Sequence, residues 1–139
     1  MQNKASSAEG LLALAGRVLI ATLFLNSALG KIMGFQGVVG FVASKGLPLP
    51  AVLLAGSVLL EVTASLALLA GFRTRWAALA LAGYSLLAGF LFHDFWAAPP
   101  AQAMMQQLSF FKNLGIAGGL LLVAALGPGR FGVGQQAPQ

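Results

Sequence analysis

Four long apolar runs, separated by short polar or glycine- and proline-rich segments, make up most of this sequence. They cover approximately residues 11–30, 50–71, 75–95 and 105–127. A helix needs about 20 mostly apolar residues to cross the ~30 Å hydrocarbon core of a bilayer, and each run reaches that length. We therefore expect an all-α integral membrane protein, a four-helix bundle with short loops.

The composition argues against a soluble domain. Only 8% of the 139 residues are charged, whereas a soluble domain has about 25%. We expect a polar N-terminal tail (1–10), a single transmembrane domain (11–129) with a glycine- and proline-rich linker after its first span, and a disordered C-terminal tail (130–139). A cleavable signal peptide is the alternative for the first run, but that run is long and contains Arg17.

The basic residues predict the orientation of the bundle. An even number of spans places both termini on one side of the membrane. That side collects Lys4, Arg73, Arg75 and Arg130, and the other side has Lys31 and Lys45. The positive-inside rule then favours cytoplasmic termini. The net charge of +5 does not indicate nucleic-acid binding, because no basic cluster with interleaved aromatic residues is present.

Residue types that are missing narrow the chemistry. The chain has no cysteine and a single histidine, His93. Thiolate nucleophiles, Cys-ligated iron–sulfur clusters and a haem held by two histidines of one chain are therefore excluded. We expect no metal site and no covalently bound cofactor, so redox chemistry would use a diffusible or partner-held cofactor.

Glu61 is the most informative single position. A carboxylate near the bilayer centre costs about 2.5–3.5 kcal/mol on insertion scales and needs a partner or water. Ser57 and Ser65 lie one turn to either side, so this polar stripe should face the bundle interior. Arg17 and Lys112 are the predicted countercharges. A structural alternative remains open, in which Glu61 only holds the helices together.

Lys112 and its neighbours form a second polar group. Lys112 shares a helix face with Gly115 and Gly119, a spacing of small residues that lets helices approach closely. We therefore expect this face to pack inward. Asn113 can form a hydrogen bond to another helix.

A third polar group lies at the outer end of the third span. His93, Asp94 and Trp96 are predicted to lie near Lys31, where they would form a pocket with acid, base and stacking surface. The alternatives are a solvated His93 and a Trp96 that only anchors the helix at the membrane interface.

The ordered set of these motifs resembles the DoxX family of small four-span bacterial membrane proteins. The matching segments are Ser27-Ala28-Leu29-Gly30-Lys31, Glu61 with Gly71-Phe72-Arg73-Thr74-Arg75, Phe92-His93-Asp94-Phe95-Trp96 and Phe111-Lys112-Asn113-Leu114-Gly115. The resemblance implies a bacterial inner-membrane location. It also implies a link to quinone chemistry and to membrane oxidoreductase assemblies, since the family name comes from a subunit of a thiosulfate:quinone oxidoreductase.

The resemblance further implies a shared polar constellation: Lys31, Glu61, His93, Asp94, Trp96, Lys112 and Asn113. Our leading hypothesis is a quinone-linked redox subunit. Glu61, His93 and Asp94 are then the catalytic candidates that relay protons, and the quinone-binding candidates are Lys31, His93, Trp96, Lys112 and Asn113.

Two other functions stay open. The chain could be a non-enzymatic accessory or scaffold subunit of a larger oxidoreductase complex, with a membrane or soluble partner or a second copy of itself. A small-solute transporter is the weaker alternative, because no inverted repeat or pair of broken helices is visible.

Overall fold

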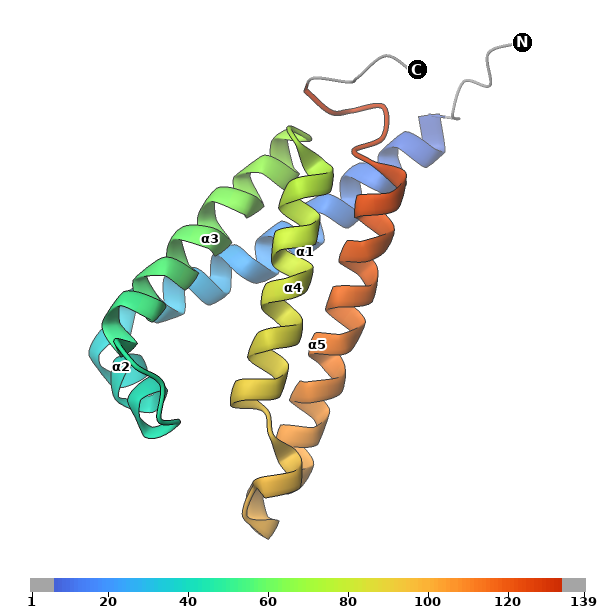
Figure 1. Cartoon of the computed structure of the whole chain (residues 1–139). Helices are drawn as coiled ribbons and strands as arrows, with labels where there is room; N and C mark the ends of the chain where they lie inside the picture. The colour runs from blue at the N-terminus through green and yellow to red at the C-terminus, as the bar shows by residue number, and fades with distance from the viewer. Residues whose placement is uncertain (1–6, 134–139) are drawn as a thin grey trace.

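The computed structural model describes residues 7–133, which form a bundle of long helices (Figure 1). The elements are α1 (Ser7–Met33), α2 (Phe35–Ser44), α3 (Pro50–Ala70), α4 (Thr74–Phe92), a short 3₁₀ helix η1 (Phe95–Ala97) and α5 (Pro100–Leu126). Four of these segments, beginning at Ser7, Pro50, Thr74 and Pro100, are long and apolar enough to cross a membrane. The expected four-helix membrane bundle is therefore confirmed.

The helices pack in the order α1, α3, α4, α5, with the closest packing between α4 and α5. In Figure 1, α1 passes obliquely behind the others, and α3 and α4 diverge from the tight turn that joins them. Small and leucine side chains fill the shared core, among them Ala21, Ala64, Leu68, Ala78, Leu81 and Leu120. Such small residues let helices approach each other in lipid, where there is no water to drive association.

The end of the bundle that contains the α3–α4 turn is called here the terminal end, because both described chain ends lie there. Arg130 Nη1 of the C-terminal segment donates to Ser7 Oγ of α1 at 3.3 Å. The opposite end, which contains α2 and η1, is called the α2 end.

The segment after the first span contains a helix that the sequence reading did not predict. We expected a glycine- and proline-rich linker, but α1 runs to Met33 and α2 begins at Phe35 after a one-residue interruption at Gly34. Glycines weaken a helix in isolation, yet α2 is apolar and packs against α3, and tertiary packing overrides propensity. Between α2 and α3, residues 45–49 form turns and bends.

Two helix starts also differ from the predicted ones. Helix α1 begins at Ser7, inside the predicted polar tail, and α5 begins at Pro100, five residues before the predicted span. Pro100 is the first residue of α5, directly after Pro99. Proline suits that position because its missing N–H would have no helical partner there.

The α5 face that packs on α4 is not the one expected. Phe110, Ala117, Leu120 and Ala124 are buried, at helical spacing, whereas Lys112 and Gly115 are exposed. Gly89 of α4 provides the close approach instead, since a Cβ added there would lie 3.4 Å from the Cβ of Asn113.

Arg17 closes the terminal end of the bundle. It is 1% exposed, and its guanidinium donates to the carbonyl oxygens of Leu68 at 2.7 Å, Leu69 at 3.2 Å and Phe131 at 2.5 Å. The last carbonyls of a helix have no partner within it, so Arg17 satisfies those of α3. The prediction that Arg17 pairs with Glu61 is therefore wrong.

The same contact holds part of the predicted disordered tail. Residues 130–133 come after α5 and lie against the end of α3, where Val133 N donates to Ala70 O at 2.9 Å. Residues 134–139, the remainder of that predicted tail, lie outside the described residues.

The packing of the tail predicts that alanine lowers stability more at Gly71 than at Gly46. Both glycines have a left-handed backbone conformation. Gly71 (φ +69°) and Gly46 (φ +74°) would each be strained by a side chain, at about 1–2 kcal/mol. A Cβ at Gly71 would also lie 2.5 Å from Gly132 Cα and 2.8 Å from Arg17 Nη1, whereas nothing lies within 4 Å at Gly46. Gly71→Ala should therefore lower the free energy of unfolding by about 1–3 kcal/mol more than Gly46→Ala, measured by denaturation in detergent micelles. Equal losses would contradict the tail contact.

Candidate functional site

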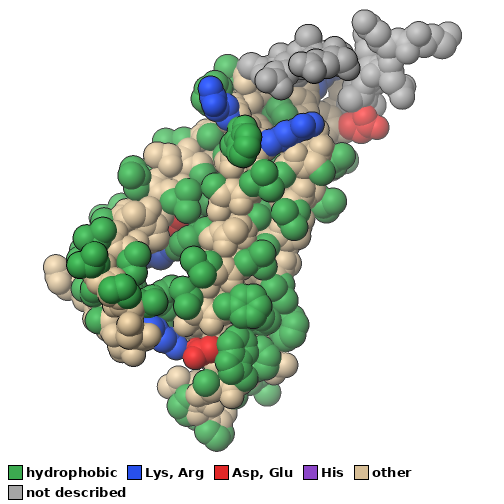
Figure 2. Space-filling model, viewed as in Figure 1, with side chains coloured by type: hydrophobic (Ala, Val, Ile, Leu, Met, Phe, Trp, Pro, Cys, Tyr) green, Lys and Arg blue, Asp and Glu red, His purple; other side chains and the backbone are tan. Residues whose placement is uncertain are grey.

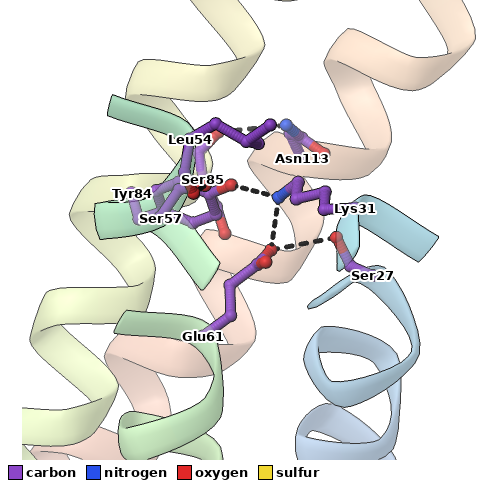
Figure 3. A network of polar contacts seen from close by, with 8 residues as sticks. All are labelled: Ser27, Lys31, Leu54, Ser57, Glu61, Tyr84, Ser85 and Asn113. Atoms are coloured by element: carbon purple, nitrogen blue, oxygen red, sulfur yellow. Dashed lines mark hydrogen bonds and ion pairs between the residues drawn. The ribbon is translucent and has the colours of Figure 1, made fainter. Parts of the chain in front are cut away.

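A buried ion pair joins α1 and α3 at the middle of the bundle (Figure 3). Glu61 lies about 16 Å from the start of α3 and about 14 Å from its end, at 1.5 Å per residue. Its Oε1 lies 2.8 Å from Lys31 Nζ and accepts a second hydrogen bond from Ser27 Oγ at 2.9 Å. Ser27 and Lys31 are one turn apart on α1, so one helix face supplies both donors.

Tyr84 brings α4 into the same network. Lys31 Nζ donates to Tyr84 Oη at 2.5 Å and lies 5.1 Å from the centre of the ring. Figure 3 shows the Lys31 ammonium between the tyrosine hydroxyl and the Glu61 carboxylate. We call Ser27, Lys31, Glu61 and Tyr84 the central network; it links three helices.

The network is enclosed on the Glu61 side and open on the Lys31 side. The Glu61 side chain is 1% exposed, but that of Lys31 is 21% exposed. Figure 2 shows an opening between α2 and the lower half of α4, with charged atoms visible at its edges. The α2 end closes below it through Phe41 and Phe92, whose ring centres are 5.7 Å apart.

Glu61 also has unused hydrogen-bonding capacity. Its second oxygen, Oε2, is buried and has no hydrogen-bond partner in the described part of the chain, and the same is true of Ser65 Oγ one turn away. Buried polar atoms without partners are uncommon, and each one calls for an explanation such as a bound molecule or a functional role.

The predicted partners of Glu61 were wrong in identity. As predicted, the Glu61 carboxylate and Ser65 face the interior of the bundle. The basic partner of Glu61, however, is Lys31 and not Arg17 or Lys112. Lys31 had been assigned to the membrane surface because Gly30-Lys31 resembled a helix end. In the structure α1 continues through it and α2 extends the bundle beyond it.

The residues predicted to surround Lys31 at the α2 end have other contacts. Asp94 Oδ1 lies 2.8 Å from Lys45 Nζ, in a partly exposed ion pair. His93 Nδ1 lies 2.8 Å from Gln106 Oε1 of α5. Trp96 packs against Phe90, Phe95 and Phe110 with ring-centre distances of 5.2–6.1 Å. None of the three hydrogen-bonds to Lys31 within residues 7–133, so the predicted pocket does not form.

Asn113 and Lys112 are consecutive but point to different sides of α5. Asn113 Nδ2 donates to the carbonyl of Ser85, the neighbour of Tyr84, at 3.1 Å, which is the expected contact with another helix. Lys112 is exposed and lies in a groove between α1 and α5.

Sequence reasoning missed Tyr84, Ser27 and Lys45 as functional-site contacts. Tyr84 was detectable, because it is the only tyrosine in the chain and lies inside an apolar span. Ser27 was detectable as the residue one turn before Lys31. Lys45 carried no such signal, since its ion pair with Asp94 depends on how α2 folds.

The central network combines an acid, a base and a phenol at hydrogen-bond distance inside a low-dielectric region. Such groups can donate to a carbonyl oxygen and pass protons between one another. The arrangement suits a small polar group carried by a lipid-soluble molecule, which would reach Lys31 before Glu61.

Comparisons with known proteins agree with this architecture. A family model described as DoxX matches residues 12–94, a range that contains the whole central network. The inner membrane protein YqjF of Escherichia coli (strain K12) is 41% identical over 123 residues, which are 86% of this chain and 87% of that protein. The inner membrane protein YphA of the same organism is 33% identical over 123 residues, 88% of each chain.

No solved structure matches the chain. The four apolar helices and the two inner-membrane relatives together identify a multi-pass inner-membrane protein. With the family model covering more than half of its length, the chain belongs to the DoxX family.

Proposed function

We propose that this DoxX-family protein binds a quinone in the inner membrane and moves protons to or from its carbonyl oxygens. One observation carries the proposal. Near the middle of α3, the buried Glu61 carboxylate pairs with a Lys31 side chain that is 21% exposed, and one Glu61 oxygen has no hydrogen-bond partner within residues 7–133.

The chemistry of the network fits a quinone head group. A quinone dissolves in the bilayer and carries two carbonyl oxygens that accept hydrogen bonds. Lys31 and Tyr84 supply N–H and O–H donors that lie within hydrogen-bond distance of each other. Glu61, hydrogen-bonded to Lys31, can hold the proton that passes to the reduced ring.

The balance of the reaction requires a second component. Reduction of a quinone to its quinol consumes two electrons and two protons. The residues of the central network transfer protons, so the electrons would come from a partner oxidoreductase or a diffusible donor. In this proposal His93, Asp94 and Trp96 form the α2 end and do not touch the quinone.

The orientation that we propose keeps the terminal end in the cytoplasm. Arg73, Arg75 and Arg130 lie in the turn, first helical residues and tail of that end, and an excess of arginine and lysine favours the cytoplasmic side. The α2 end would then face the outer side of the membrane.

We expect a short-chain benzoquinone to bind saturably to the protein in nanodiscs. Glu61→Gln and Tyr84→Phe should each weaken binding about tenfold or more, because each removes a charged or hydroxyl group that interacts with Lys31. The measurement is equilibrium titration followed by tryptophan fluorescence quenching.

The matched control is Lys45→Met. It breaks the other ion pair, which is partly exposed at the α2 end, and should leave the quinone affinity unchanged. No saturable binding, or equal weakening by all three variants, would reject a quinone site at the central network.

The second candidate function is that of an accessory subunit, in which the central network only holds helices together. The observation that favours it is that exposed Lys112 has no hydrogen bond or ion pair within residues 7–133. Under this alternative the same substitutions would change stability and leave quinone affinity, if any, unaltered.

A double-mutant cycle measures the structural contribution of the pair. Lys31→Met should lower the free energy of unfolding by about 3–5 kcal/mol, because it leaves the Glu61 carboxylate buried without a countercharge. Lys31→Met combined with Glu61→Gln should recover part of that loss. Additive losses in detergent denaturation would show that the two side chains do not interact.

A further inference from the structure

Lys112 is a charged side chain on the outside of the bundle, near the middle of a helix long and apolar enough to cross a membrane. It lies about 18 Å from the start of α5 and about 21 Å from its end. A lysine side chain reaches about 6 Å, which is less than the distance from Lys112 to either end of α5. Lys112 has no hydrogen bond or ion pair within residues 7–133. An isolated charge at this depth is costly, and such residues normally mark a contact or a functional pathway.

Around Lys112 the surface has the shape of a helix-binding groove. It has a volume of about 580 Å³ and lies between α1 and α5, with Leu19 and Leu23 on one side and Gly115 and Gly119 on the other. Nothing lies within 4 Å of a Cβ added at either glycine. Glycines one turn apart let a neighbouring helix approach the backbone closely.

The charge of the groove determines the kind of partner. Lys112 needs an acceptor, and a carboxylate is the strongest that a protein offers. The chain has three acidic residues. Glu61 is buried against Lys31, Asp94 is paired with Lys45 at the α2 end, and Glu9 lies in the first turn of α1 at the terminal end. A second copy therefore offers no carboxylate at the depth of Lys112.

We propose that the α1–α5 groove binds a transmembrane helix of a different protein, which presents an aspartate or glutamate at mid-membrane to Lys112. The apolar rim and the glycines receive the body of that helix, and the ion pair sets its depth. Lys112 is not part of the central network, so this surface does not depend on the quinone proposal.

The test uses the full-length protein in liposomes with a labelled synthetic leucine–alanine helix that carries one central glutamate. Energy transfer between protein and helix should report saturable association. A matched helix with glutamine in place of glutamate should bind about tenfold more weakly, and Lys112→Met should weaken binding of the glutamate helix by a similar factor.

A pair of glycine variants tests the groove itself. Gly115→Leu fills the groove from the outside and should abolish association. Gly118→Leu is the control, because Gly118 is equally exposed and has open space around it but does not line the groove. Neither change inserts atoms into the bundle, so both variants should keep the unfolding midpoint of the parent protein.

Equal affinity for the two helices, or no effect of Lys112→Met, would overturn the proposal. Saturable energy transfer between two copies of the protein, lost in Lys112→Met, would overturn it in favour of a homodimer. Quinone affinity measured on Lys112→Met separates this surface from the central network: a normal value is expected whether or not the helix binds.

Discussion

A charge inside hydrocarbon must find a partner, and in this protein that requirement fixes how three helices meet. The core between α1, α3 and α4 consists largely of alanine and leucine side chains, which tolerate sliding and rotation better than polar contacts do. The bond from Lys31 to Glu61 and the bond from Lys31 to Tyr84 each exist in one register only. We interpret the central network as the feature that selects this arrangement of helices from other apolar packings.

The terminal end satisfies the same requirement with different chemistry. Arg17 is as deeply buried as Glu61, yet it has no carboxylate and binds three carbonyl oxygens instead. A planar guanidinium can serve several acceptors at once, whereas a lysine ammonium is a point charge. Arginine therefore suits a helix end, where unpaired carbonyls gather, and lysine suits a site where one carboxylate and one hydroxyl must share a proton donor.

The sequence predicted the four spans and the inward orientation of Glu61, because hydropathy and the cost of burying a charge follow from the order of residues along the chain alone. It did not predict how far along the bundle Lys31 lies or which face of α5 is buried. Lys31 was placed at the membrane surface by counting from an apparent helix end, and the oblique course of α1 together with α2 invalidated that count. Lys112 was placed inside because glycines shared its face, whereas Phe110 and Ala117 occupy the buried face of α5. Spacing identifies a face but not the neighbour that it meets.

Lys31 and Lys112 show how one constraint leads to two different roles. Both lysines lie on helices long and apolar enough to cross a membrane, but Lys31 is bonded to Glu61 and Tyr84 of its own chain, whereas Lys112 has no such partner within residues 7–133. The first can exchange protons with a small molecule, and the second can only be satisfied from outside. The two positions are also connected, since Asn113, the residue after Lys112, bonds to the carbonyl of Ser85, the residue after Tyr84. Lys112 lies on a different side of α5 from Asn113, so a helix bound at Lys112 would leave this bond in place.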